Sequence, residues 1–83
     1  MSTLISEPKA TKVTFSKYNF TIHLEDGREL SVPFSYFPRL ERATPSQLEK
    51  YELSGGGIGI HWDELDEDIS VAGLLQGVGD RKR

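Results

Sequence analysis

The chain has 83 residues, of which 36% are hydrophobic, and it carries a formal net charge of -3 at pH 7. These values exclude an intrinsically disordered chain, which would have few apolar residues and a high net charge, and they allow a single hydrophobic core. The absence of cysteine excludes a disulfide framework and a thiolate zinc site, and it favours the cytoplasm as the compartment.

The two ends of the chain differ from its middle. Residues 1–11 are small and polar and show no periodicity, so they predict a flexible tail. Residues 78–83 end in Arg81-Lys82-Arg83 and predict a flexible basic tail. Residues 12–77 remain as one domain. No apolar run approaches the roughly 20 residues that cross a bilayer, and no signal-peptide core is present at the N-terminus, so we expect no membrane contact.

The first half of the domain predicts three strands near residues 12–16, 19–25 and 28–34, because apolar and polar residues alternate there. Asp26-Gly27 favours a hairpin with a type I' turn, which needs positive φ at both central residues. Pro33 has no amide hydrogen, so the third strand should end there or lie at a sheet edge. The predicted buried face of this hairpin consists of Phe20, Ile22, Leu24, Leu30, Val32 and Phe34.

A turn and a helix are predicted next along the chain. Residues 35–40 are rich in aromatic side chains and should form a turn or a helical turn that packs on the sheet. Thr44-Pro45-Ser46-Gln47 has the pattern of a capping box with proline in the first helical position. We therefore expect a short helix over residues 44–50.

The last part of the domain predicts more strand and one more helix. Residues 51–62 should form strand segments joined by the glycines at 55–57. Ser70 should cap a helix over residues 71–76 that ends at Gly77. Together these elements predict an α+β fold, a small mainly antiparallel sheet with two short helices packed on one face.

The same residues carry a resemblance to an uncharacterised bacterial family, domain of unknown function 2442. The matching segments are Leu24-Glu25-Asp26-Gly27-Arg28, residues 33–40, Gly56-Gly57-Ile58-Gly59-Ile60-His61-Trp62, residues 65–71 and Leu74-Leu75. Many relatives have proline directly after the tryptophan, where this chain has Asp63. The family has no established activity to transfer. The resemblance implies a protein partner, because such genes often lie beside another small gene in toxin-antitoxin-like pairs.

Five acidic residues lie close together without a basic residue among them, namely Asp63, Glu64, Asp66, Glu67 and Asp68. Residues 1–62 hold seven acidic and seven basic residues, so the negative charge comes from this segment. A solvated loop, a surface for a basic partner and a metal site are the three interpretations, in that order of preference. The glycine and the glutamate of a calcium-binding loop are missing, and the acidic charge disfavours nucleic acid.

His61 is the strongest candidate for acid-base chemistry, because it should face away from the core next to these carboxylates. His23 has a weaker case on the polar face of its strand. No cysteine or strand-to-helix serine motif supplies a nucleophile. The glycines at 55–57 lack the flanking residues of a phosphate loop, and Trp62 is expected in the core.

The sequence therefore favours a cytoplasmic, non-enzymatic interaction module with an antitoxin-like or adaptor role. Its partner would be a protein with a basic surface, bound through His61 and the five acidic residues, without nucleic acid, membrane, metal or cofactor. The alternative is a small enzyme or metal-dependent protein centred on His61 with Asp63 or Asp66. An enzyme would need a concave pocket with convergent polar groups.

Overall fold

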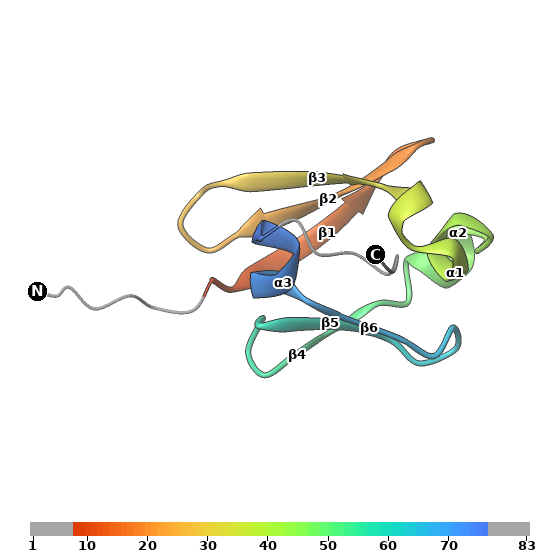
Figure 1. Ribbon diagram of the computed structural model, residues 1–83. Helices are drawn as coiled ribbons and strands as arrows, with labels where there is room; N and C mark the ends of the chain where they lie inside the picture. The colour runs from red at the N-terminus through yellow and green to blue at the C-terminus, as the bar shows by residue number, and fades with distance from the viewer. Residues whose placement is uncertain (1–7, 77–83) are drawn as a thin grey trace, which may run out of the picture.

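Two three-stranded antiparallel sheets face each other across one hydrophobic core (Figure 1). The structure is a computed structural model and describes residues 8–76. In chain order the elements are β1 (Ala10–Phe15), β2 (Asn19–Leu24), β3 (Glu29–Pro33), the 3-10 helix η1 (Phe34–Tyr36), α1 (Pro38–Glu41), α2 (Pro45–Leu48), β4 (Glu52–Ser54), β5 (Gly59–Trp62), β6 (Glu67–Ser70) and α3 (Val71–Leu75). The predicted α+β class is confirmed.

The number of sheets differs from the prediction of one. β1, β2 and β3 form the first sheet in that order, and β4, β5 and β6 form the second. η1, α1 and α2 carry the chain from one sheet to the other and close one end of the space between them (Figure 1). Each sheet has one apolar face, and the two faces bury each other, so the short helices are not the cover of a single sheet.

The first sheet begins earlier than the alternation indicated. β1 starts at Ala10, which is only 2% exposed, whereas the sequence placed the start of the domain at Lys12. A register shift between Ala10 and Lys12 turns both Ala10 and Val13 toward the core. A bulge of this kind breaks the period of two, which is why the pattern missed it. Residues 1–7 of the tail predicted at 1–11, the tail predicted at 78–83 and the helix end at Gly77 lie outside the described residues.

The β2–β3 hairpin is confirmed, but its turn is not type I'. The Gly27 N–H donates to the Leu24 carbonyl at 3.0 Å, and the Leu24 N–H donates to the Arg28 carbonyl at 2.8 Å. Gly27 has φ of 96°, whereas Asp26 is not among the described residues with positive φ. This is the pattern of a three-residue connection with glycine in the last position. Asp26 instead accepts hydrogen bonds from the backbone and side chain of Arg28.

Replacing Gly27 by valine should lower the free energy of unfolding by about 1–3 kcal/mol, because a β-branched residue resists positive φ. No atom lies within 4 Å of a Cβ built at this position, so the loss would come from the backbone alone. Chemical denaturation measures it. Gly27→Asn is the matched control and should lose less, because asparagine tolerates positive φ. Equal stability of Gly27→Val and wild type would contradict this turn.

The predicted register of the hairpin is confirmed by the pairing of Phe20 with Val32 and of Ile22 with Leu30. Five of the six residues expected on the inner face are buried, and Leu30 packs partly buried against them. Pro33 ends β3, which is an edge strand, so its missing amide hydrogen costs no ladder bond.

Trp62 joins the two sheets at the centre of the core. It is 1% exposed, as the sequence predicted, and its indole N–H donates to the Leu48 carbonyl at 3.0 Å. Its ring meets Phe20 of the facing sheet edge-on, with 6.4 Å between centroids, and lies the same distance from Tyr51. One side chain therefore contacts both sheets and the helical connection between them.

Two further hydrogen bonds tie the outer edge of β1 to the second half of the chain. The Ala10 N–H donates to the Gly57 carbonyl at 2.7 Å, and the Val13 N–H donates to the Tyr51 hydroxyl at 3.0 Å. The three glycines that join β4 to β5 all have positive φ, and Gly57 has φ of 114°. The glycines thus serve a tight strand connection, as predicted, and bring that connection against β1.

The helices α2 and α3 begin with the predicted caps. Thr44 and Gln47 form a reciprocal capping box at α2, and the Ser70 hydroxyl accepts a hydrogen bond from the Gly73 N–H at 3.1 Å in α3. η1 and α1 occupy the segment where an aromatic turn was expected, and Phe37 and Leu40 pack into the core. Within residues 8–76 no helix is long and apolar enough to cross a membrane.

Candidate functional site

The acidic segment is a tight turn followed by a strand, and not the loop that the sequence indicated. Trp62 of β5 pairs with Glu67 of β6, so only residues 63–66 form the connection. The Asp66 N–H donates to the Asp63 carbonyl at 3.3 Å, and Asp66 has φ of 54°, which aspartate tolerates better than most residues. The sequence missed β6 because an acidic residue occupies one of its inward positions and interrupts the apolar alternation.

The structure divides the six predicted partner-binding residues between different surroundings. The side chains of Asp63, Asp68 and Glu64 are 93%, 77% and 53% exposed. Asp66 is also exposed, and His61 is half-buried on the outward side of β5. Glu67 faces inward with a side chain that is only 7% exposed. It is therefore not part of an exposed acidic surface.

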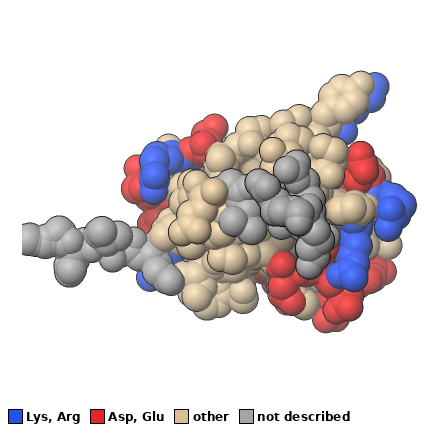
Figure 2. Space-filling model, in the orientation of Figure 1, with Lys and Arg blue, Asp and Glu red and all other residues tan. Residues whose placement is uncertain are grey.

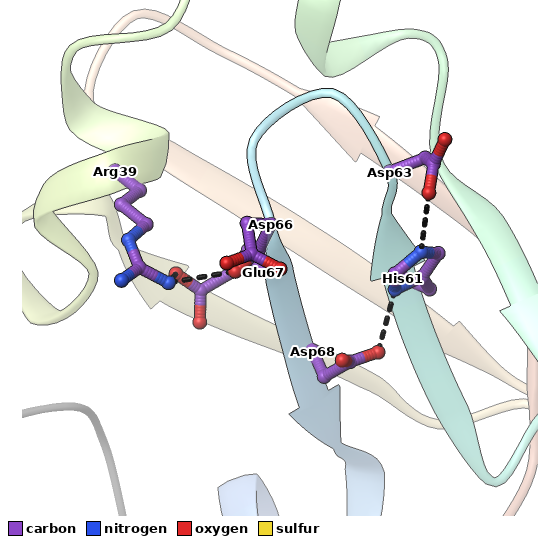
Figure 3. A network of polar contacts seen from close by, with 6 residues as sticks. All are labelled: Arg39, His61, Asp63, Asp66, Glu67 and Asp68. Carbon is purple, nitrogen blue, oxygen red and sulfur yellow. Dashed lines mark hydrogen bonds and ion pairs between the residues drawn. The ribbon is translucent and has the colours of Figure 1, made fainter.

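Arg39 of α1 holds the end of this turn (Figure 3). Its guanidinium donates to the Asp66 carbonyl at 2.6 Å and lies 3.9 Å from the Glu67 carboxylate. A buried carboxylate is costly without a nearby cation, so this arginine compensates the inward position of Glu67. The sequence offered no signal for the contact, since Arg39 and Asp66 are 27 positions apart.

His61 lies between two carboxylates (Figure 3). Asp68, its partner across the β5–β6 pair, has a carboxylate oxygen 2.6 Å from Nδ1, and Asp63 has one 3.3 Å from Nε2. A neutral imidazole has a single N–H, whereas ionised carboxylates only accept hydrogen bonds. Both contacts are satisfied together only when the ring carries two protons. The outward direction and the acidic neighbours of His61 were predicted correctly.

The two carboxylates raise the pKa of His61 above its ordinary value of 6.5, the hydrogen bond with Asp68 more than that with Asp63. A group with a raised pKa in the folded state stabilises the fold fully below its unfolded pKa. This contribution is lost as the pH rises through the folded pKa. His61 therefore stabilises the β5–β6 hairpin fully below its ordinary pKa and loses that effect as the pH rises through the raised pKa.

The contacts of His61 bear on the catalytic and metal-dependent alternatives. Both ring nitrogens face carboxylates when the ring carries two protons. Asp63 and Asp68 lie on opposite nitrogens and cannot share one ion with the ring. Asp66, the other acidic residue of that alternative, accepts a hydrogen bond from Arg39 through its backbone carbonyl. Within the part of the chain that the structure describes, no group of three His, Asp or Glu residues could hold a metal ion.

An open cleft of about 530 Å³ lies beside His61, where β4 and the β5–β6 turn meet. It is lined by Lys50, Tyr51, Glu52, Asp63 and Glu64. Glu52 enters this set because it pairs with His61 across β4 and β5, a contact that the sequence did not predict. The Lys50 amine lies 3.8 Å from the Glu64 carboxylate. One of the lining residues, Lys50, thus already places its positively charged amine next to a carboxylate of the cleft.

Figure 2 shows Asp and Glu side chains gathered over the β5–β6 turn, with Lys and Arg side chains next to them. A second mixed group lies at the opposite end of the molecule, over the β2–β3 turn. His23 belongs to the first sheet and contacts the Thr14 hydroxyl at 2.9 Å and the Glu29 carboxylate at 3.4 Å. The two histidines therefore lie in separate surroundings.

Comparison with known proteins gives a family but no activity. A model of the family described as "Protein of unknown function (DUF2442)" matches residues 10–80. No curated protein gives a significant match. A crystal structure of a protein of unknown function from Rhodospirillum rubrum is 34% identical, with a TM-score of 0.80 over 93% of this chain and 95% of that chain. The NMR structure of an uncharacterized Chromobacterium violaceum protein is 29% identical, with a TM-score of 0.75 over 88% of this chain and 69% of that chain.

Proposed function

We propose that this chain, which belongs to the DUF2442 family of proteins of unknown function, is a non-enzymatic interaction module of the cytoplasm. Its acidic surface, formed by Glu52, Asp63, Glu64 and Asp68 around His61, binds a basic segment of another protein. An adaptor or antitoxin-like role is the specific form of this function.

The arrangement of the second sheet supports this proposal. Glu52, His61 and Asp68 occupy neighbouring positions on β4, β5 and β6, and their side chains share the outward face. Asp63 and Glu64 extend the same surface along the turn. Among residues 8–76, no Lys or Arg forms an ion pair with Glu52, Asp63 or Asp68. The surface therefore keeps a negative potential that would attract a basic partner.

The cleft beside β4 is the observation that carries the proposal. Three of its five lining residues carry carboxylates, and the aromatic residue Tyr51 lines it as well. An arginine or lysine side chain has the matching form, an apolar stem with a charged head. Lys50 lies at the rim with its amine near Glu64, and a cation from a partner would compete with it.

Neutralising the cleft should weaken binding of a capped arginine-rich peptide without unfolding the protein. The variant is Glu52→Gln, Asp63→Asn and Glu64→Gln together. Exposed ion pairs contribute about 0.2–1 kcal/mol each, so three lost pairs correspond to a roughly threefold to hundredfold higher Kd. Titration calorimetry at low ionic strength measures the change, and added salt should reduce it.

The matched control removes the same charge from exposed sites elsewhere, with Glu25, Glu29 and Glu41 changed to glutamine. If binding of the peptide depends only on the net charge of the protein, both triple variants will lose affinity equally. That result would show that the cleft is not the binding site. Capture of partners from native lysate by the wild type and by the two variants then extends the comparison to natural ligands.

A further inference from the structure

His61 lies where three charged groups of the acidic surface converge. Asp68 of β6 faces its Nδ1 atom, Asp63 of the turn faces its Nε2 atom, and Glu52 is its neighbour on β4. These are the charged groups that face the ring from the elements packed against it. Asp63 has a second role, because it also lines the cleft beside β4. One carboxylate is thus shared between the histidine and the candidate binding site.

The protonation state of His61 decides where the Asp63 carboxylate is directed. When the ring carries two protons, it donates to both Asp68 and Asp63. When it loses one, a single N–H remains, and the contact of 2.6 Å with Asp68 should persist in preference to that of 3.3 Å with Asp63. Asp63, whose side chain is 93% exposed, then faces the cleft without a histidine partner. The local formal charge becomes more negative by one unit at the same time.

We infer that His61 is a proton-controlled regulator of the acidic surface, which withholds Asp63 from a cationic partner when protonated and releases it when neutral. The inference rests on the proposed function, since it concerns the regulation of the same surface. A partner cation and the imidazolium compete for one carboxylate. Binding should therefore strengthen as the pH rises, and it should promote loss of the His61 proton, because coupling between two sites is reciprocal.

The test uses the full chain and a short arginine peptide with both ends capped, so that the peptide itself does not titrate near neutrality. The Kd is measured between about pH 5 and pH 8, the range in which histidine changes charge. For wild type, the Kd should fall roughly twofold to fivefold across the titration of His61, the effect of one exposed ion pair. His61→Gln should remove this dependence, whereas His23→Gln, the control in the first sheet, should retain it.

NMR titration of the His61 ring provides a readout that a merely structural histidine would not change. Saturating peptide should raise the acid dissociation constant of the ring by the same factor that deprotonation gains in affinity, so the pH midpoint of that titration should fall. If wild type and His61→Gln bind with the same pH dependence, or the midpoint does not move, the inference is wrong while the proposed function stands. If the peptide does not bind at any pH, the proposed function fails and the inference fails with it.

Discussion

Replacing Trp62 by alanine is expected to lower the free energy of unfolding by about 3–5 kcal/mol, through lost transfer energy and the cavity that remains. Domains of this size have a total stability on the order of 0.05–0.15 kcal/mol per residue, so the variant should lose a large share of its stability. The effect is large because the indole contacts Phe20 across the core and donates to the Leu48 carbonyl. Denaturant unfolding followed by far-UV circular dichroism measures it.

Trp62→Phe is the matched variant, since it keeps most of the apolar contact and removes the N–H donor. Its loss should be smaller than that of the alanine variant, and it includes the cost of removing the donor to the buried Leu48 carbonyl, about 1–3 kcal/mol. If Trp62→Ala were as stable as Trp62→Phe, the indole would not fill the space between the sheets.

Replacing Gly57 by alanine is expected to cost about 2–5 kcal/mol, from positive φ and from steric overlap acting together. A Cβ at Gly57 would overlap the Ala10 carbonyl oxygen, and it would lie only 3.0 Å from the Ala10 nitrogen. These are backbone atoms of β1, so no side chain can rotate away. The substitution should loosen the contact between β1 and the β4–β5 connection, which thermal unfolding and amide chemical shifts of β1 would report.

Gly56→Ala is the control for Gly57→Ala. Gly56 has φ of 73°, but no atom lies within 4 Å of a Cβ built there. Gly56→Ala should lower the free energy of unfolding only by the cost of the positive-φ backbone conformation, about 1–2 kcal/mol. The difference between the two variants measures the close approach to Ala10. Equal losses would contradict that approach.

Features that depend on neighbours in sequence were predictable. The β2–β3 hairpin, the capping box at Thr44 and the Ser70 cap of α3 follow from local alternation and side-chain chemistry. The burial of Trp62 and the outward direction of His61 follow from the alternation of a single strand. In each case the residues that determine the structure lie within a few positions of one another.

Features that depend on distant residues were not predictable from the pattern. The split into two sheets depends on how the helical connection turns the chain between β3 and β4. Glu67 looked like one more solvated acid, because its compensating partner Arg39 lies on α1. The cleft depends on the pairing of Glu52 with His61, which places β4 beside the acidic turn. The alternation of apolar and polar residues indicates which face of a strand is buried, but it does not indicate which strand lies beside it.

The two hydrogen bonds at the outer edge of β1 have a consequence for hydrogen exchange. Each sheet consists of consecutive hairpins, so most of its amides are protected by local pairing. The Ala10 and Val13 amides instead donate to Gly57 and Tyr51, far away along the chain. Their exchange with solvent requires the two sheets to separate, even while each hairpin stays intact. These two protons therefore distinguish undocking of the sheets from unfolding of the hairpins.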